Sequence, residues 1–206
     1  CASVGALLVV NVRGVMMRIG ISICSYYRVD DPRVGAQFMV ERTRAAREAD
    51  LDSLFVGDHH VTPTPYFQNT AILGRMLAEW GNKPAGALYL LPLWNPVLLA
   101  EQIGTLAAIM QGRFIMQCGL GGDAKQSAGM GVELKRRAPM FEDSLNIMQA
   151  LWRGETVTHE RFWNIRGARI SPVPAEPVEV WVGSTAPASI NRTARMAEGW
   201  LASPGI

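Results

Sequence analysis

The sequence has almost no net charge, few cysteines and no long apolar run. Lys and Arg total 20 against 18 Asp and Glu, so the 206 residues carry a net charge of only +2. This balance argues against a nucleic-acid partner, and the basic run Lys135-Arg136-Arg137 is too short to form a binding stripe. No apolar stretch reaches the ~18 residues that a membrane-spanning helix needs. We therefore expect neither nucleic acid nor a membrane as a partner.

Cysteine is scarce, and its number is odd. The three cysteines are Cys1, Cys24 and Cys118. An odd set with two members inside expected buried strands does not suit a disulfide framework, and it favours a reducing, cytoplasmic location. We expect Cys24 and Cys118 to be small core residues rather than nucleophiles, because nothing near them in the sequence would favour a thiolate.

Residues 1–16 are expected to be a leader that does not belong to the native domain. Met17 stands just before the first convincing strand, and we interpret it as the native start. The apolar run at 6–10 has no basic segment ahead of it, and Arg13 follows closely, so translated upstream sequence is preferred over a signal peptide. Residues 17–206 then form one domain. Because 49% of the chain is hydrophobic, it can bury a sizeable core.

Strand-like and helical patterns alternate along this domain. We predict strands at 18–24, 51–56, 85–91, 114–118, 178–182 and 199–203, and helices at 32–49, 69–80, 96–110, 140–152 and 187–197. A polar excursion covers 119–139, long enough to be a binding loop, and a small hairpin covers 157–165. The expected apolar face of the first helix is Val34, Phe38, Val40, Ala45 and Ala46. That of the third helix is Val97, Ala100, Ile103, Gly104, Ala107 and Ala108.

Six rounds of strand and helix predict either a TIM (β/α)8 barrel or a doubly wound open sheet. No Gly-x-Gly-x-x-Gly follows the first strand, which disfavours a dinucleotide-binding open sheet. The preferred prediction is an α/β TIM barrel that is truncated after about six strands, with its first and last strands unpaired at their outer edges. In both folds a ligand binds at the carboxyl ends of the strands. Those ends are at 24–27, 58–60, 91–95, 119–122 and 183–185.

The polar residues at these ends allow more than one chemistry. A histidine such as His59 can exchange a proton with a bound ligand, whereas Asp58 and His60 could also cap or solvate a strand end. Gly183-Ser184-Thr185, just before a helix, offers the backbone N–H groups that a phosphate needs, and the glycines at 119–122 form either a second cradle or only a turn. A metal-dependent hydrolase is the weaker hypothesis, because adjacent ligands splay apart. We predict no metal site.

Several segments, taken together in their order and spacing, resemble the bacterial luciferase-like flavin- or deazaflavin-dependent oxidoreductases. The resemblance covers about Met17 to the last residue. The matching segments are Gly57-Asp58-His59-His60, Leu91-Pro92 with Asn95-Pro96 and Ala100-Glu101, Gly112-Arg113-Phe114 with Gly119-Leu120-Gly121, Leu151-Trp152-Arg153-Gly154, and Ala197-Glu198-Gly199-Trp200.

This resemblance implies a TIM barrel that holds FMN or the deazaflavin F420 at its mouth and acts as an oxidoreductase or monooxygenase on a small organic substrate. It places His59 and Asp58 near the reactive ring as catalytic residues. Implied cofactor-binding residues are Ala87 and Leu88, near an expected non-proline cis bond, Gly119, Leu120, Gly121 and Gly122, and Gly183, Ser184 and Thr185. Leu120 stands where some members have a phosphate-binding arginine. A homodimer of the full-length protein and a catalytically inactive flavin-binding barrel both stay open.

Overall fold

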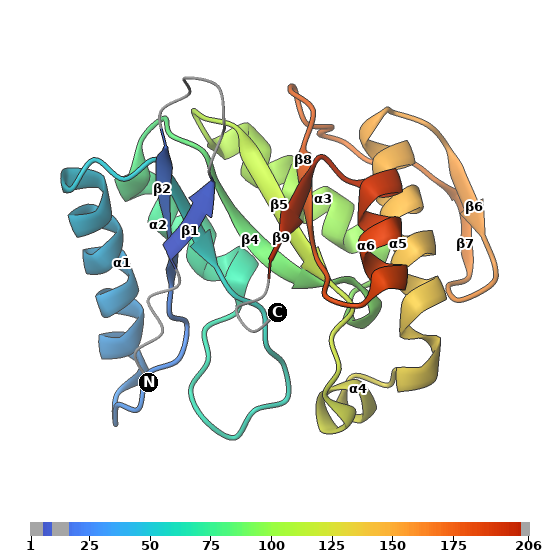
Figure 1. Ribbon diagram of the computed structural model, residues 1–206, viewed down its shortest axis with the longest axis horizontal. Helices are drawn as coiled ribbons and strands as arrows, with labels where there is room; N and C mark the ends of the chain where they lie inside the picture. The colour runs from blue at the N-terminus through green and yellow to red at the C-terminus, as the bar shows by residue number, and fades with distance from the viewer. Residues whose placement is uncertain (1–5, 10–16, 203–206) are drawn as a thin grey trace.

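The computed structural model describes residues 6–9 and 17–202 of the chain. Its main sheet has the strand order β1-β2-β3-β4-β5-β8-β9, and neighbours from β2 to β9 are parallel (Figure 1). The strands are β1 (Ala6–Val9), β2 (Arg18–Ile23), β3 (Ser53–Val56), β4 (Ala85–Leu90), β5 (Phe114–Gly119), β8 (Glu179–Gly183) and β9 (Gly199–Leu201). The six parallel strands, β2 to β5 with β8 and β9, match the strands predicted from the sequence.

β1 lies inside the segment that was expected to be a leader. It pairs antiparallel with β2, with Ala6 opposite Ile21 and Val9 opposite Arg18. The expectation that β2 would present an unpaired edge is therefore wrong, because residues 6–9 occupy that edge. The other edge is formed by β9, as expected. Residues 10–16, which include Arg13, lie outside the described part.

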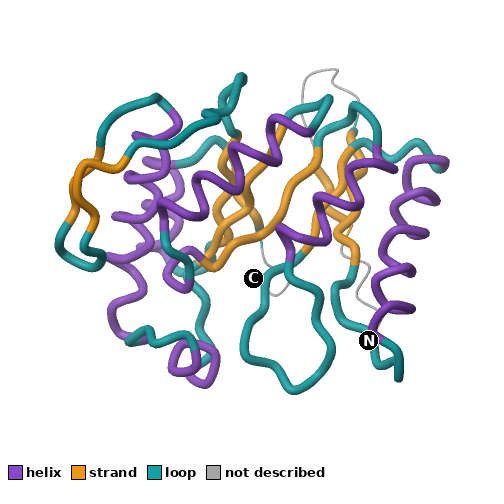
Figure 2. The backbone as a smooth tube through the Cα atoms, turned by 180° about the vertical axis from the view of Figure 1, so that it is seen from behind, coloured by secondary structure: helices purple, strands orange, loops and turns teal. Residues whose placement is uncertain are grey.

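Helices connect the parallel strands, and α2 and α3 lie across the convex face of the sheet (Figure 2). The longer helices are α1 (Pro32–Glu48), α2 (Asn69–Trp80), α3 (Pro96–Ile109), α5 (Arg137–Trp152) and α6 (Pro187–Met196). The polar excursion contains α4 (Ala124–Gly129) and the short helix η2 (Leu134–Arg136), and η1 (Leu91–Leu93) follows β4. The predicted hairpin exists as β6 (Val157–His159) with β7 (Ile165–Ala168).

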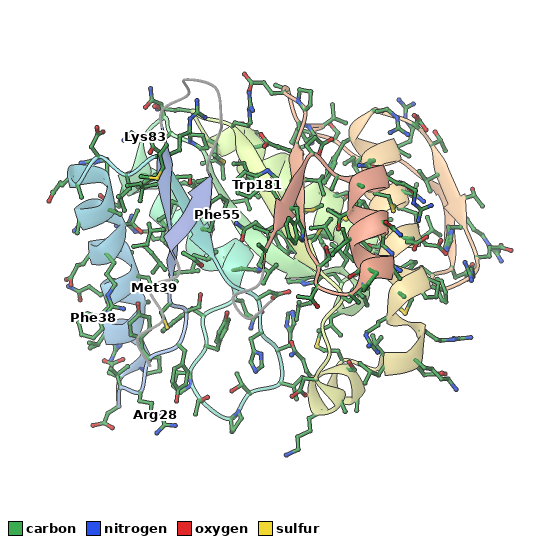
Figure 3. The ribbon with its side chains drawn as sticks, in the orientation of Figure 1. Arg28, Phe38, Met39, Phe55, Lys83 and Trp181 are labelled. Carbon is green, nitrogen blue, oxygen red and sulfur yellow. The ribbon has the colours of Figure 1, made fainter. Side chains whose placement is uncertain are left out.

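The sheet curls into half of a barrel. Phe55 on β3 and Trp181 on β8, both labelled in Figure 3, have ring centroids 5.6 Å apart although β4 and β5 lie between their strands. Gly86 of β4 stands opposite Phe55, and a Cβ atom there would be 1.7 Å from the Ile115 carbonyl oxygen. Only glycine permits this close approach. The predicted truncated TIM barrel is thus confirmed as a six-stranded half-barrel.

The hydrophobic core lies between the convex face and the helices. Two of the predicted helix faces were partly wrong. In α1, Val34 and Phe38 are 40% and 37% exposed, and the buried face is Gly35, Met39, Val40, Thr43 and Ala46. A Cβ atom at Gly35 would be 2.9 Å from the Phe67 ring, so the absence of a side chain at Gly35 lets α1 pack closely against Phe67. In α3, Ala108 is exposed while Leu99 and Leu106 are buried.

The helix starts follow the expected chemistry. Asp31 Oδ1 accepts from Arg33 N at 2.9 Å, and Asn95 Oδ1 accepts from Val97 N at 3.0 Å. Proline stands in the first turn of α1, α3 and α6, where its missing N–H costs nothing. The segments 57–68 and 120–136 follow β3 and β5 at the carboxyl ends of the strands, and both hang below the sheet in Figure 1.

Candidate active site

Asp58 ties together the carboxyl ends of two neighbouring strands. It follows β3 directly and is 7% exposed. Its Oδ2 accepts from Leu90 N at 2.8 Å, at the end of β4, and from Trp94 Nε1 at 2.9 Å. Because these donors belong to the backbone and to a core-packed indole, the carboxylate has a clear anchoring role. This agrees with the alternative in which Asp58 caps a strand end.

His60 completes this anchor. Its Nε2 lies 3.0 Å from Asp58 Oδ1, within ion-pair distance, and neither atom has a hydrogen-bond partner among the described residues. The ring is 8% exposed and stands edge-on to Trp94, with ring centroids 5.3 Å apart. The structure therefore pairs Asp58 with His60 and not with His59.

His59 faces the opposite way and is half-buried. Its Nδ1 lies 3.4 Å from Nε2 of Gln126, which comes from α4, and its ring centroid is 5.5 Å from that of Tyr66. Gln126 is 5% exposed, and its Oε1 accepts from His60 N at 2.9 Å. The two histidines thus have different surroundings: His60 is locked into the strand end, whereas His59 keeps part of its ring accessible.

Tyr66 brings a hydroxyl to the same place. Its oxygen would be 2.6 Å from a Cβ atom at Gly57, so it lies directly over the end of β3. Burial raises the pKa of Tyr66 to about 12; the nearby Ser25 hydroxyl opposes this shift, and the Asp58 charge adds to it. The phenol therefore stays protonated at neutral pH and can donate a hydrogen bond.

The loop that carries these residues is tied at its carboxyl end to the end of β2. Tyr27 N donates to Pro65 O at 3.3 Å, and Phe67 N donates to Ser25 O at 2.9 Å, which joins residues 65–67 to the end of β2. Val61, at the exposed tip, has a φ of +52°, which a β-branched residue rarely adopts. Such strain is typical of functional loops.

The two glycine segments that were implied to bind a phosphate lie on neighbouring strands. β5 and β8 pair in register from Ile115 with Glu179 to Cys118 with Val182, so Gly119 and Gly183 end side by side. Gly121 has a φ of +66°, and a Cβ atom at Gly122 would meet nothing within 4 Å. Backbone N–H groups in such a turn are accessible to an anion.

The hydroxyl groups next to this turn differ in availability. Ser184 is 6% exposed, and its Oγ lies 3.0 Å from Thr193 Oγ1, which in turn donates to Ser189 O. The Ser184 side chain is therefore used inside the fold, while Thr185 is exposed just ahead of α6. Leu120 is half-buried and packs against the core.

The expected non-proline cis bond near Ala87 and Leu88 is absent. In the described part of the chain the cis peptide bond is Ser171–Pro172. Ala87 is fully buried in the core, whereas the Leu88 carbonyl accepts from Asn69 Nδ2 at 2.6 Å. Both residues continue the regular parallel pairing of β4 with β5, which a trans backbone satisfies.

The two described cysteines have different environments. Cys118 is fully buried, and burial raises the pKa of its thiol, which makes it the inert core residue that was expected. Cys24 is exposed, so its assignment to the core was wrong. It stands one residue beyond the end of β2.

Metal ligands and membrane spans can be checked over residues 6–9 and 17–202. Within these ranges no three His, Cys, Asp or Glu side chains gather in a way that could hold a metal ion. No helix in them has the length and apolar character needed to cross a membrane.

Sequence reasoning missed Gln126 and Tyr66. Asp123 was the available signal for Gln126, because an aspartate favours a helix start and its Oδ1 accepts from Gln126 N at 2.7 Å.

Two solved structures share this architecture. One is an F420-dependent secondary alcohol dehydrogenase in complex with an F420-acetone adduct, with a TM-score of 0.73 and 19% identity over 88% of this chain and 56% of that one. The other is the oxygenating component of 3,6-diketocamphane monooxygenase from Pseudomonas putida in complex with FMN, with a TM-score of 0.68 and 22% identity over 81% of this chain and 51% of that one. At these identities the likeness shows the fold alone.

Curated relatives point the same way. The F420-dependent glucose-6-phosphate dehydrogenase of Nakamurella multipartita is 27% identical over 190 residues, which are 87% of this chain and 56% of the relative. That of Intrasporangium calvum is 26% identical over 203 residues, 92% of this chain and 59% of the relative. The chain thus spans less than two thirds of their length. The family model for luciferase-like monooxygenases matches residues 17–205. The chain therefore belongs to the luciferase-like monooxygenase family.

Proposed function

We propose that this half-barrel is the cofactor-binding part of an oxidoreductase that uses FMN or F420 on a small organic substrate. The observation that carries the proposal is His59, half-buried beside the protonated Tyr66 phenol at the carboxyl ends of the strands. Ligand sites of parallel barrels lie at this end. The relatives named above are F420-dependent, and the two similar structures hold F420 and FMN, which supports either cofactor.

The residues present fit a phosphorylated cofactor. The turn at Gly121 and Gly122 has open space in front of it, and it stands next to the end of β8 and the start of α6. Because the Ser184 hydroxyl is already paired with Thr193, we propose that backbone N–H groups and Thr185 bind the phosphate. This also accounts for Leu120, since a backbone cradle needs no arginine at that position.

Each residue at the mouth then has a definite task. Either cofactor, when bound, supplies the hydride or oxygen chemistry, so the protein must position it and exclude water. His59 would exchange a proton with the ligand, and Tyr66 would donate a hydrogen bond to it. Asp58 and His60 would hold the strand ends in place, which makes Asp58 a positioning residue rather than a catalytic one.

Two substitutions separate binding from turnover. His59→Ala should lower turnover by ~100-fold or more while changing cofactor affinity little, because a proton-transfer group acts on the reacting state. Gly121→Val should weaken cofactor binding by at least ~10-fold, since a side chain at φ +66° is strained and fills the cradle. Fluorescence titration with FMN and with F420 measures affinity and distinguishes the two cofactors.

The control is His159→Ala, which removes a histidine from β6 on the hairpin, away from the mouth. It should leave both turnover and cofactor affinity unchanged. Unaltered turnover in His59→Ala would remove its proposed role. Unaltered affinity in Gly121→Val would remove the proposed cradle. A chain that binds neither cofactor would contradict the proposal as a whole.

A further inference from the structure

We infer that Gln126 fixes which nitrogen of His59 carries the proton. Gln126 bridges the two histidines: its Oε1 accepts from the backbone N–H of His60 at 2.9 Å, and its Nε2 lies 3.4 Å from His59 Nδ1. The inference concerns a positioning residue of the proposed site, and its importance for catalysis rests on the proposed function. The assignment of the tautomer does not depend on the proposed function.

The orientation of the Gln126 amide follows from chemistry alone. A backbone N–H can only donate, so the amide atom that faces it must be the oxygen. The other end of the amide, which faces His59, is then the NH2 group, which can only donate. His59 Nδ1 must accept this hydrogen bond, so it carries no proton. In the neutral ring the proton is therefore on Nε2.

This tautomer puts the N–H group of His59 on the ring nitrogen that Gln126 does not contact. Gln126 is the one side chain that hydrogen-bonds the His59 ring within the ranges 6–9 and 17–202. The other polar contact of this residue is made by its backbone, whose carbonyl accepts from Gln68 Nε2 at 3.1 Å. Nε2 of His59 is thus left as a donor for a ligand at the mouth.

Gln126 is well placed to impose this arrangement. The amide is 5% exposed, and the residue is fixed at the start of α4 by the bond from its N–H to Asp123 Oδ1. α4 packs tightly on the histidine loop, because a Cβ atom at Gly129 would be 2.6 Å from Val61 Cγ1. The segment that follows β5 therefore sets the tautomer of His59, which lies after β3.

Gln126→Glu tests the inference because it keeps the shape but replaces the NH2 group by an acceptor. The carboxylate can still accept from His60 N–H, and it now also accepts from His59, so the proton should move to Nδ1. Long-range proton–nitrogen NMR spectra of the three histidines distinguish the two tautomers, and single His→Gln variants assign the signals.

We expect wild-type His59 to be protonated on Nε2, and the Gln126→Glu variant on Nδ1. Gln68→Glu is the matched control, because it adds the same charge beside His59 but contacts only the backbone carbonyl; its His59 spectrum should match wild type. In the proposed reaction, Gln126→Glu should lower turnover by at least ~10-fold and Gln68→Glu by less than ~2-fold.

Two results would overturn the inference: wild-type His59 protonated on Nδ1, or the same tautomer in wild type and Gln126→Glu. The first needs no variant, so the test stands even if Gln126→Glu fails to fold. The expected tautomers without any effect on turnover would instead count against the proposed function, and they would leave the role of Gln126 in setting the tautomer intact.

Discussion

The polar groups at the two ends of the half-barrel are used differently. At the amino end, polar groups pair with each other: Arg113 with Glu179 at 2.8 Å, and Asp52 Oδ2 with Ile19 N at 2.7 Å. Arg113, Glu179 and Asp52 line a cavity of about 440 Å³. At the carboxyl end, Asp58 and His60 also pair with each other. His59, in contrast, lies on a long loop, and Gln126 contacts only its Nδ1, which leaves Nε2 available to a ligand. Under the proposed function, the amino end is a structural base and the carboxyl end is the reactive mouth.

Removing the Asp58 carboxylate should have the largest effect on stability. Asp58→Ala leaves Leu90 N–H and Trp94 Nε1–H without their acceptor, and it removes the carboxylate that lies 3.0 Å from the His60 ring. Loss of one partner from a buried polar network costs about 3–5 kcal/mol of unfolding free energy. Asp58→Asn keeps one acceptor oxygen and should cost about 1–2 kcal/mol. Chemical denaturation measures both.

Asp30→Ala is the control for this change, because Asp30 is an exposed aspartate near the start of α1. It should alter stability by less than about 0.5 kcal/mol. Equal small effects of Asp58→Ala and Asp30→Ala would mean that the anchor at the mouth is not a stabilising network, and the proposed division between anchor and reactive residue would fail.

Tyr66 predicts how the mouth responds to alkaline pH. Its folded pKa is raised to about 12, so between about pH 10 and 12 the unfolded chain loses a proton that the folded chain keeps. The stability contributed by the neutral phenol is full below pH 10 and is lost as pH rises through 12. Tyr66→Phe should reduce this loss by about 1 kcal/mol, after allowance for its partial exposure to solvent.

Denaturation at pH 9 and pH 11 tests this prediction, and absorbance titration follows the phenol directly. The variant should lose less stability than wild type between the two values. An equal loss in both proteins would show that Tyr66 is not shielded from water at the mouth.

The smallest expected effect lies away from both ends, on the helices. Arg44 and Arg75 hold the pKa of Glu79 at about 2, which links α1 to α2. A depressed carboxyl pKa stabilises the fold above the unfolded value near ~4.3 and loses this contribution as pH falls towards 2. In the Glu79→Gln variant, the unfolding free energy should therefore fall slightly less than in wild type as the pH is lowered. Glu101→Gln on α3 serves as a control and should leave that fall unchanged.

The sequence predicted the architecture well because the signals for it are local. Pro32 and Pro96 marked helix starts, and the buried runs of β4 and β5 were continuous. The face of α1 was harder to predict: Phe38 is more apolar than Thr43, yet Thr43 is buried because its hydroxyl donates to Met39 O. Hydropathy alone cannot predict that a polar side chain will be buried because it forms a hydrogen bond to its own helix.

The sequence predicted at which end of the strands the candidate residues lie, but not which of them contact each other. His59, Asp58 and the glycine segments do lie at the carboxyl ends of the strands, as a parallel sheet requires. The contacts of Gln126 with His60 N and with His59 Nδ1 join residues that are 66 and 67 positions apart in sequence. Local patterns carry no information on such contacts, and the pairing of β1 with β2 is a further example.

The most direct test of the central claim is to map where the cofactor binds on the isotope-labelled chain. NMR spectra recorded during addition of FMN, and separately of F420, report on both ends at once. We predict shifts at the His59 ring and at the backbone N–H groups of Gly121 and Gly122, with Arg113 and Glu179 unmoved. Shifts that gather around Arg113 and Glu179, with His59 unchanged, would show that the ligand binds at the amino end and would contradict the account.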